Sequence, residues 1–583
     1  MYIEKVNTPQ DIKGLNINEL NVLADEIRAG VLNRVSSHGG HVGPNLGFTE
    51  ATVAMHYVFD APRDKFVFDV SHQVYPHKML TGRKDGFLKA DDMNAISGYS
   101  SPRENSEYDL FEVGHTSTSV ALASGLQAAR DLLGEKYNIL VVIGDGSLSG
   151  GEAFEGLNVA AEAGTNFIVL FNDNGMSIAE NHGGMYKSLA ALRESNGESS
   201  NNIFRALGFD YMYVEAGNDV EKLVDAFRKV KDIDHPIVVH LHTEKGHGYQ
   251  PAVEDKEAWH WSVPFDLKTG KPKVVGSGES FSDLLGQYLV RKAEHDDKLL
   301  VVQSAVPAMS GLSKERREAL GKHYVDVGIA EEAVALISGA AKAGAHPVWG
   351  TPATFMQRTY DQLCQDLAVN GNPAVINVLG ASIYGMNDFT HICFFDIPMF
   401  SHIPNLVYLA PTTWEEFIAM EDWAIAQNQY SVALRVPCAV VHSDEAYPTD
   451  YSQLNKFQVT HRGNRVAVIA VGGFFQKGEA VLKLLADEGI DATLINPRYL
   501  TGVDEQLLDE LKSDHQLVVT LEDGSLDGGF GERIARYYGP TDMRVLNFGV
   551  KKALYDRYDV NELLRENHLT EAQIVADIKA GLA

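Results

Sequence analysis

Polar residues follow two short apolar runs in the first half of the chain, at the spacing that two strands of one sheet would give. The run Ile139–Ile143 is followed by Gly144-Asp145-Gly146, and the run 166–171 by Asn172-Asp173-Asn174, roughly 30 residues further on. If the runs are neighbouring parallel strands, Asp145 and Asn174 lie at the same carboxyl edge, where open α/β sheets bind ligands. One carboxylate and one amide oxygen provide half of a Mg²⁺ shell, which phosphate and water oxygens commonly complete. The spacing therefore predicts a clamp for a metal ion and a diphosphate.

The segment between the two runs suits a phosphate group. Gly144 and Gly146 let a ligand approach the backbone closely, and a helical pattern at Glu152–Ala163, closed by Gly164, would direct free N–H groups toward an anion. A Gly-Asp-Gly turn after a strand also occurs as a plain turn, and here it lacks the third glycine of the dinucleotide fingerprint. The second polar turn, Asn172-Asp173-Asn174, favours the functional interpretation.

The chain of 583 residues has an acidic composition that restricts its partners. It carries 50 Lys and Arg against 79 Asp and Glu, a formal net charge of −29. A broad nucleic-acid or anionic-membrane surface requires clustered basic side chains, so we expect neither partner. No apolar run approaches the ~20 residues of a membrane span. Because the cysteines Cys364, Cys393 and Cys438 are few and scattered, and the N-terminus lacks a secretory pattern, a reducing cytoplasm is the expected setting.

Apolar, β-branched runs alternate with Ala-, Leu- and Glu-rich helical patterns along the whole chain. Such runs are typical of parallel strands covered by helices on both faces. We therefore predict an α/β protein of three doubly wound domains with mostly parallel sheets, spanning 1–275, 276–450 and 451–583, with seams in the polar segments 251–280 and 441–463. The runs taken as strands are 139–143, 167–171, 237–241, 299–302, 374–378, 432–436, 465–471, 493–495 and 517–521.

The paired turns and the motifs around them resemble the thiamine-diphosphate-dependent transketolase superfamily, and most closely its 1-deoxy-D-xylulose-5-phosphate synthase branch. The resemblance implies a transketolase-like thiamine-diphosphate fold, thiamine diphosphate and Mg²⁺ as cofactors, and a homodimer. It also implies that the three domains are a diphosphate and metal domain, a pyrimidine-binding domain and a C-terminal transketolase-like domain. The matching motifs follow the family order and lie at 68–78, 113–119, 172–178, 327–331 and 354–362, with looser matches at 496–499 and 521–524.

The resemblance implies a role for each residue that matches a motif. Asp145, Asn174 and the carbonyl of Met176 would bind Mg²⁺, and Glu331 would hydrogen-bond the aminopyrimidine ring and so promote proton loss from the thiazolium. Phe355 would pack on that ring and Lys245 would pair with the diphosphate. Without the resemblance, Glu331 would be interpreted as a first-turn acid that offsets a helix dipole, Phe355 as a core aromatic and Lys245 as an exposed loop lysine. The other cofactor-binding residues expected are His72, Gly114, His115, Gly144, Gly146 and Ser147.

Proton transfer and substrate binding are expected from histidines and from one arginine segment. Reactions on thiamine need donors to a developing alkoxide and groups that carry protons. The resemblance favours His41, His115 and His391 for this work, followed by His260 and His72. Arg358, Tyr360 and His391 are the expected substrate-binding residues.

Two departures from the family pattern concern the acceptor's phosphate. The family places arginines where this chain has Gly380 and Cys438, and each charged hydrogen bond of that kind is worth about 1.5–3 kcal/mol. The leading hypothesis is a ligase that decarboxylates pyruvate and transfers the two-carbon unit to an aldehyde, glyceraldehyde 3-phosphate in the family. One alternative is a transketolase-like enzyme with a different donor or a different acceptor, which includes unphosphorylated acceptors. Another is a non-catalytic paralogue, suggested by Ala333 in place of a family histidine.

Overall fold

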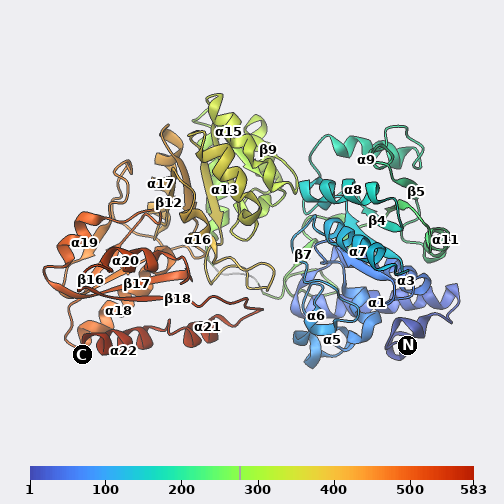
Figure 1. The fold of residues 1–583 in the computed structure, drawn as a ribbon, viewed down its shortest axis with the longest axis horizontal. Coiled ribbons are helices and arrows are strands. Elements are labelled where there is room, and N and C mark those ends of the chain that lie inside the picture. The colour runs from blue at the N-terminus through green and yellow to red at the C-terminus, as the bar shows by residue number, and fades with distance from the viewer. Residues whose placement is uncertain (275–277) are drawn as a thin grey trace. The chain divides into compact units, whose positions relative to one another are not determined.

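The computed structural model describes residues 1–274 and 278–583, which divide into two compact units (Figure 1). Unit 1 comprises Met1–Ser277 and Gly328–Ala330, and unit 2 comprises Gly278–Val327 and Glu331–Ala583. The predicted boundary at 275 lies outside the described residues. No helix in the described part of the chain is long and apolar enough to cross a membrane.

Unit 1 is built on a five-stranded, wholly parallel sheet with the order β2-β3-β4-β6-β5. The predicted strands at 139–143, 167–171 and 237–241 are confirmed as β3 (Ile139–Gly144), β4 (Phe167–Asp173) and β6 (Pro236–His242). The prediction missed β2 (Lys65–Phe68) and β5 (Asp210–Val214). β2 has only four residues, and β5 is a half-buried edge strand whose sequence, Asp-Tyr-Met-Tyr-Val, is not a continuous apolar run.

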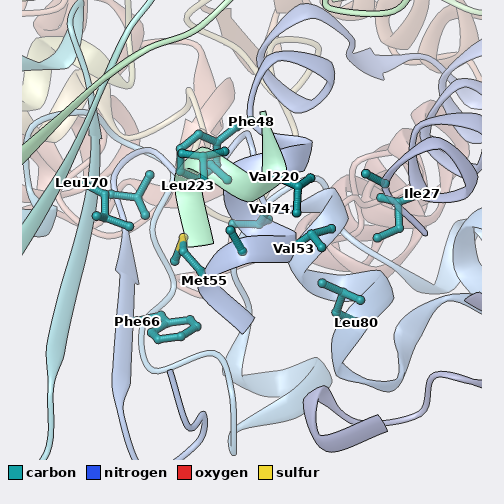
Figure 2. Close-up of a cluster of buried hydrophobic side chains, with 14 of the residues drawn as sticks. Ile27, Phe48, Val53, Met55, Phe66, Val74, Leu80, Leu170, Val220 and Leu223 are labelled. Carbon is teal, nitrogen blue, oxygen red and sulfur yellow. The ribbon is translucent and has the colours of Figure 1, made fainter. Parts of the chain in front are cut away.

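Helices cover both faces of this sheet, which explains why its central strands are mostly apolar on both faces. Along β3, Leu140 and Val142 belong to one buried cluster, while Val141 and Ile143 belong to the other. The first cluster includes side chains of α1 (Ile17–His38), α3 (Thr49–Val58) and α11 (Val220–Val230), and Figure 2 shows part of it. The second includes side chains of α7 (Ser119–Leu133) and α8 (Gly151–Ala163).

Shorter elements of unit 1 surround the sheet. A two-residue strand, β1 (Gly40–His41), pairs antiparallel with β7 (Trp261–Ser262), which joins segments far apart in the sequence. The remaining helices are α2 (Gly43–Gly47), α4 (Tyr75–Lys78), α5 (Asp85–Leu88), α6 (Pro102–Asn105), α9 (Met185–Glu194), α10 (Ile203–Leu207) and α12 (Gln250–Glu254).

Unit 2 contains two further sheets. The six-stranded sheet has the order β12-β13-β11-β10-β8-β9 and is parallel throughout; its strands are β8 (Leu299–Gln303), β9 (Tyr324–Asp326), β10 (His346–Pro352), β11 (Val375–Leu379), β12 (Leu406–Leu409) and β13 (Ser431–Arg435). The five-stranded sheet has the order β14-β16-β15-β17-β18, where only β14 pairs antiparallel; its strands are β14 (Gln458–His461), β15 (Arg465–Ala470), β16 (Thr493–Asn496), β17 (His515–Ser525) and β18 (Arg544–Val550).

The three large sheets, parallel except at one edge strand, confirm the predicted fold class. All nine predicted runs coincide with strands. The division into three domains stays a prediction, because the contacts separate two units and the second holds two of the sheets. The helices of unit 2 are α13 (Phe281–Ala293), α14 (Lys314–Leu320), α15 (Ala335–Lys342), α16 (Asp396–Ser401), α17 (Trp414–Ala426), α18 (Phe475–Asp487), α19 (Glu505–Leu511), α20 (Phe530–Tyr538), α21 (Val560–Glu566) and α22 (Glu571–Leu582).

Candidate functional site

The two polar turns predicted to form a clamp follow adjacent strands of unit 1. β3 pairs parallel with β4 in a register that sets Gly144 opposite Asn172. The N–H of Asp145 donates to the carbonyl of Asn172 over 3.1 Å, so the two turns start side by side. The Asn174 side-chain oxygen accepts from the N–H of Met176 at 3.2 Å, which curves the chain back at this edge. Asp145 and Asn174 therefore lie at the same carboxyl edge, as their spacing predicted.

The segment after Gly146 differs from the sequence-based expectation. A single 3-10 turn, Ser147–Ser149, separates the glycine from α8, which begins only at Gly151. The α8 N-terminus therefore does not follow the turn directly. The Gly146 position is nevertheless restricted by packing, because a Cβ there would lie 2.8 Å from the Ser177 hydroxyl. The glycine lets the turn after β3 pack against the turn after β4.

The oxygen atoms at this edge fit a hard cation such as Mg²⁺. Asp145 is almost fully buried, and burial, followed by the nearby Asp173 charge, raises the pKa of its carboxyl. A cation would favour the ionised form. The Asn181 amide donates to this carboxylate over 2.8 Å, while the Asn181 oxygen and the Ser177 hydroxyl have no hydrogen-bond partner among the described residues. In the same described part, no group of three His, Cys, Asp or Glu side chains could hold a metal ion alone, so a Mg²⁺ ion here would need oxygens from a ligand and from water.

Lys245 is buried beside the same turns, which rules out the alternative of an exposed loop lysine. Its side chain is 2% exposed, and its Nζ donates to the carbonyl of Ser177 over 2.6 Å. Burial lowers the pKa of this amine to about 8, while the neighbouring Asp145 carboxylate acts in the opposite direction. A diphosphate would supply the negative charge that keeps this ammonium protonated.

Three of the predicted histidines form one cluster in unit 1. The ring centroids of His41, His72 and His260 lie 5.0–5.5 Å apart. The β1–β7 pairing brings His41 next to the segment of His260, and the Asn45 amide donates to the carbonyls of both His41 and His72, over 2.8 and 2.7 Å. Among the described residues, the buried Nδ1 atoms of His72 and His260 have no hydrogen-bond partner. Burial lowers the pKa of His72 to about 3, so its ring is neutral and its unpartnered nitrogen can form a hydrogen bond with a ligand.

A strained loop holds Gly114 and the half-buried His115 close to the His72 segment. The backbone N–H groups of Ser117 and Ser119 donate to the buried Asp69 carboxylate over 2.8 and 3.0 Å. Val70, Ser71 and Ser117 have positive φ angles of 45°, 58° and 71°, a conformation that non-glycine residues adopt at a cost and that is common at functional sites. The role of Asp69 is not predicted from the sequence, although the residue lies within the 68–78 motif.

In unit 2, Glu331 opens a 3-10 turn that precedes α15. Its side chain is 4% exposed, and burial raises the pKa of the carboxyl. Its Oε2 lies 3.6 Å from Arg358 Nη1 but has no hydrogen-bond partner among the described residues. A first-turn acid that only offsets a helix dipole would be exposed to water, so the burial argues for a ligand role.

The other predicted residues of unit 2 lie around Glu331 or at the surface. The rings of Phe355 and His391 meet edge to face at 5.7 Å, and Phe355 is half-buried rather than a core aromatic. His391 is buried, and its Nδ1 lies 2.8 Å from the Thr390 hydroxyl. Tyr360 is 41% exposed. Arg358, predicted to bind substrate, contacts Glu331 instead of standing alone.

The two positions where the resemblance places arginines carry no cation here. Gly380 has a φ of +63°, and a Cβ at this position would meet nothing within 4 Å. Cys438 is exposed. The nearby Arg435 is buried, and it donates to the carboxylates of Asp396 and Asp523, so its charge is already paired.

Comparison with known proteins extends over almost the whole chain. The family described as 1-deoxy-D-xylulose-5-phosphate synthase matches residues 3–201 and, in an overlapping stretch, 196–243. The transketolase pyrimidine-binding domain matches 270–441 and the transketolase C-terminal domain 455–574. Proteins named 1-deoxy-D-xylulose-5-phosphate synthase from Alkaliphilus oremlandii and Caldanaerobacter subterraneus are 35% and 34% identical to this chain. The alignments cover 99% of this chain, and 99% and 98% of the two relatives. The chain belongs to the 1-deoxy-D-xylulose-5-phosphate synthase family.

Proposed function

We propose that this protein is a thiamine-diphosphate-dependent transferase that takes a two-carbon unit from pyruvate and joins it to glyceraldehyde 3-phosphate. The observation that carries the proposal is family similarity over 99% of the chain. The positions of Asp145 and Asn174 at one sheet edge and the burial of Glu331 support it. Magnesium, a homodimer, a cytoplasmic location, the three-domain division and the individual site roles belong to the same proposal.

The residues of unit 1 would hold the charged end of the cofactor. Asp145, Asn174 and the Met176 carbonyl would bind Mg²⁺, whose remaining ligands are diphosphate and water oxygens. The buried Lys245 ammonium would lie beside the diphosphate and offset part of its charge. Ser147 opens the 3-10 turn that follows Gly146, so it would lie beside the diphosphate. These groups would bind the metal ion and the diphosphate and orient the cofactor, and none of them would transfer a proton.

Glu331 would hold a proton for the aminopyrimidine ring of the cofactor. When bound, thiamine diphosphate supplies the carbanion that attacks the keto carbon of pyruvate and stabilises the product of CO₂ loss. Because burial raises the pKa of Glu331, its carboxyl is protonated over a wider pH range than an exposed glutamate and can donate to a ring nitrogen. Arg358 lies 3.6 Å from the Oε2 atom and limits that rise in pKa.

The histidines would exchange protons with the carbonyl oxygens of donor and acceptor. Neutral imidazoles such as His72 can accept a hydrogen bond at one ring nitrogen and donate at the other. The cluster of His41, His72 and His260 has two such nitrogens without a partner among the described residues. His391, beside Phe355, offers a further donor in unit 2.

An assay of the full-length protein with thiamine diphosphate, Mg²⁺, pyruvate and glyceraldehyde 3-phosphate tests the proposal. We expect CO₂ release and a five-carbon ketose phosphate detected by mass spectrometry. Replacing Glu331 with Gln should lower turnover at least ~100-fold, which is the typical contribution of one positioned acid–base group. Unphosphorylated glyceraldehyde is the comparison acceptor, and we expect it to react more slowly. Absence of both CO₂ and the five-carbon product would reject the proposed function.

A further inference from the structure

A buried charge cluster lies directly behind the turn that carries Asn174. Asp173 is the last residue of β4 and is fully buried, as is His240 on the neighbouring strand β6. The Arg193 Nη1 donates to Asp173 Oδ2 over 2.5 Å, and the His240 Nε2 lies 2.9 Å from the same oxygen. The Tyr211 hydroxyl of β5 lies 2.7 Å from His240 Nδ1 and so holds the other side of the ring.

The two oxygens of Asp173 contact different parts of the protein. Oδ2 binds Arg193 and His240, whereas Oδ1 accepts the backbone N–H of Gly175 over 3.0 Å. Gly175 has a φ of +73°, which favours glycine and lies at the bend of the turn. The carboxylate therefore connects the bend to two fixed elements, strand β6 and the last turn of helix α9.

The buried Asp173 carboxylate depends on Arg193 for its charge balance. A buried carboxylate needs a cation or several hydrogen bonds, because an unpaired charge in the interior costs several kcal/mol. Arg193 provides the formal charge and His240 an additional contact. Without Arg193, the Asp173 carboxylate would lose its cationic partner and would have to turn toward water. This rotation would release the Gly175 N–H and leave the position of Asn174 less defined.

We propose that Arg193, Asp173 and His240 are positioning residues that preorganise the Asn174–Met176 turn for the metal ion. None of the three would contact the metal, and all act through the Gly175 bend. The inference rests on the proposed function, since it assumes that this turn binds Mg²⁺ together with a diphosphate. It goes beyond that function by assigning a role to an arginine on α9, a helix that contributes no residue to the proposed cofactor or substrate contacts.

The test measures metal affinity rather than turnover. Isothermal titration calorimetry with MgCl₂ at saturating thiamine diphosphate would compare the wild-type protein with Arg193→Met. Loss of a charge-assisted pair that orders a ligand turn should weaken apparent Mg²⁺ affinity at least ~10-fold. Arg193→Lys keeps the charge but not the fork of donors, and we expect an intermediate affinity. Arg228→Met removes an exposed arginine of α11 as the matched control and should leave the affinity unchanged.

Melting of the ligand-free proteins distinguishes positioning from simple stabilisation. A purely structural role would lower the melting temperature of Arg193→Met and leave the Mg²⁺ affinity of the folded fraction as in the wild type, and this result would overturn the inference. If Arg193→Met does not fold, Arg193→Lys and His240→Gln provide the same comparison, and unchanged affinity in both would overturn it equally. Failure of the wild type itself to bind Mg²⁺ with thiamine diphosphate would instead reject the proposed function.

Discussion

At the scale of single residues, buried polar atoms without a hydrogen-bond partner occur both in the proposed site and away from it. His72, His260 and Glu331 each have one such atom among the described residues, and the proposed function assigns each of them a contact with cofactor or substrate. Leaving a buried polar atom unpaired costs about 1–3 kcal/mol. That cost is tolerable where a ligand removes it. Glu421 on α17 has the same defect away from the proposed site, so its cost should remain in the folded protein.

Glu421 should therefore make stability depend on pH. Its Oε1 accepts from the Asn377 amide over 3.0 Å, while burial raises the pKa of the carboxyl to about 8. Since the folded protein retains this proton at pH values where the unfolded chain has lost it, the free energy of unfolding falls as pH rises from ~4.5 to ~8. Replacing Glu421 with Gln removes this titration. The unfolding free energy of the variant relative to that of the wild type should therefore be roughly 2–3 kcal/mol higher at pH 8 than at pH 5.5.

Urea denaturation at the two pH values measures this difference. Asp225→Asn, at an exposed acid of α11, is the control and should show the same difference from the wild type at both pH values. An equal stability difference at pH 5.5 and 8 for Glu421→Gln would show that this carboxyl does not titrate as its burial indicates.

At the scale of elements, close backbone contact between α7 and α8 links the proposed clamp to the His115 loop. A Cβ at Gly156 of α8 would lie 2.6 Å from the backbone nitrogen of Ala121 on α7 and 3.0 Å from the Val120 Cβ. The N-terminus of α7 carries Ser119, whose N–H donates to Asp69, and α8 follows the Gly146 turn. The distance between the two helices therefore affects both loops.

Replacing Gly156 with Ala should push these helices apart. The contact is with backbone, which cannot move aside as a flexible side chain can, so we expect a loss of about 1–3 kcal/mol in unfolding free energy. Gly125→Ala on α7 is a matched control, because nothing lies within 4 Å of the added methyl group. Since alanine favours helix over glycine, the control should be neutral or up to about 1 kcal/mol more stable. Chemical denaturation measures the unfolding free energies of both variants. Equal values for Gly156→Ala and Gly125→Ala would contradict this account of the contact.

At the scale of the whole molecule, the sequence predicted the central strands well because their burial is visible in it. β3, β4 and β6 are buried on both faces, and each contains a run of at least three consecutive apolar residues. β10, which contains His346, Gly350 and Pro352, has no such run and was missed although it is central in its sheet. The Asp145 and Asn174 pair could be predicted because strand ends place residues by topology alone.

Other parts of the site depend on contacts that no local pattern encodes. His41 and His260 are more than 200 residues apart and meet through the β1–β7 pairing, which consists of two residues in each strand. Arg193 reaches Asp173 from a helix whose sequence carries no phosphate- or metal-binding motif. Such contacts arise from tertiary packing, so spacing and residue type can indicate the members of a site but not their neighbours.

The net charge of −29 should weaken the folded state at low ionic strength. Exposed like charges repel one another, and the screening length falls from ~30 Å at 0.01 M salt to ~8 Å at 0.15 M. Buried pairs such as Arg435 with Asp396 are screened far less, so added salt should relieve repulsion more than it weakens attraction.

We expect the first thermal transition of the ligand-free protein to rise by about 2–5 °C between these salt concentrations. NaCl and KCl should act equally if screening is the cause, and sucrose at equal osmolality is the control for excluded-solute effects. A transition that falls with salt would show that surface ion pairs outweigh the repulsion between the excess carboxylates.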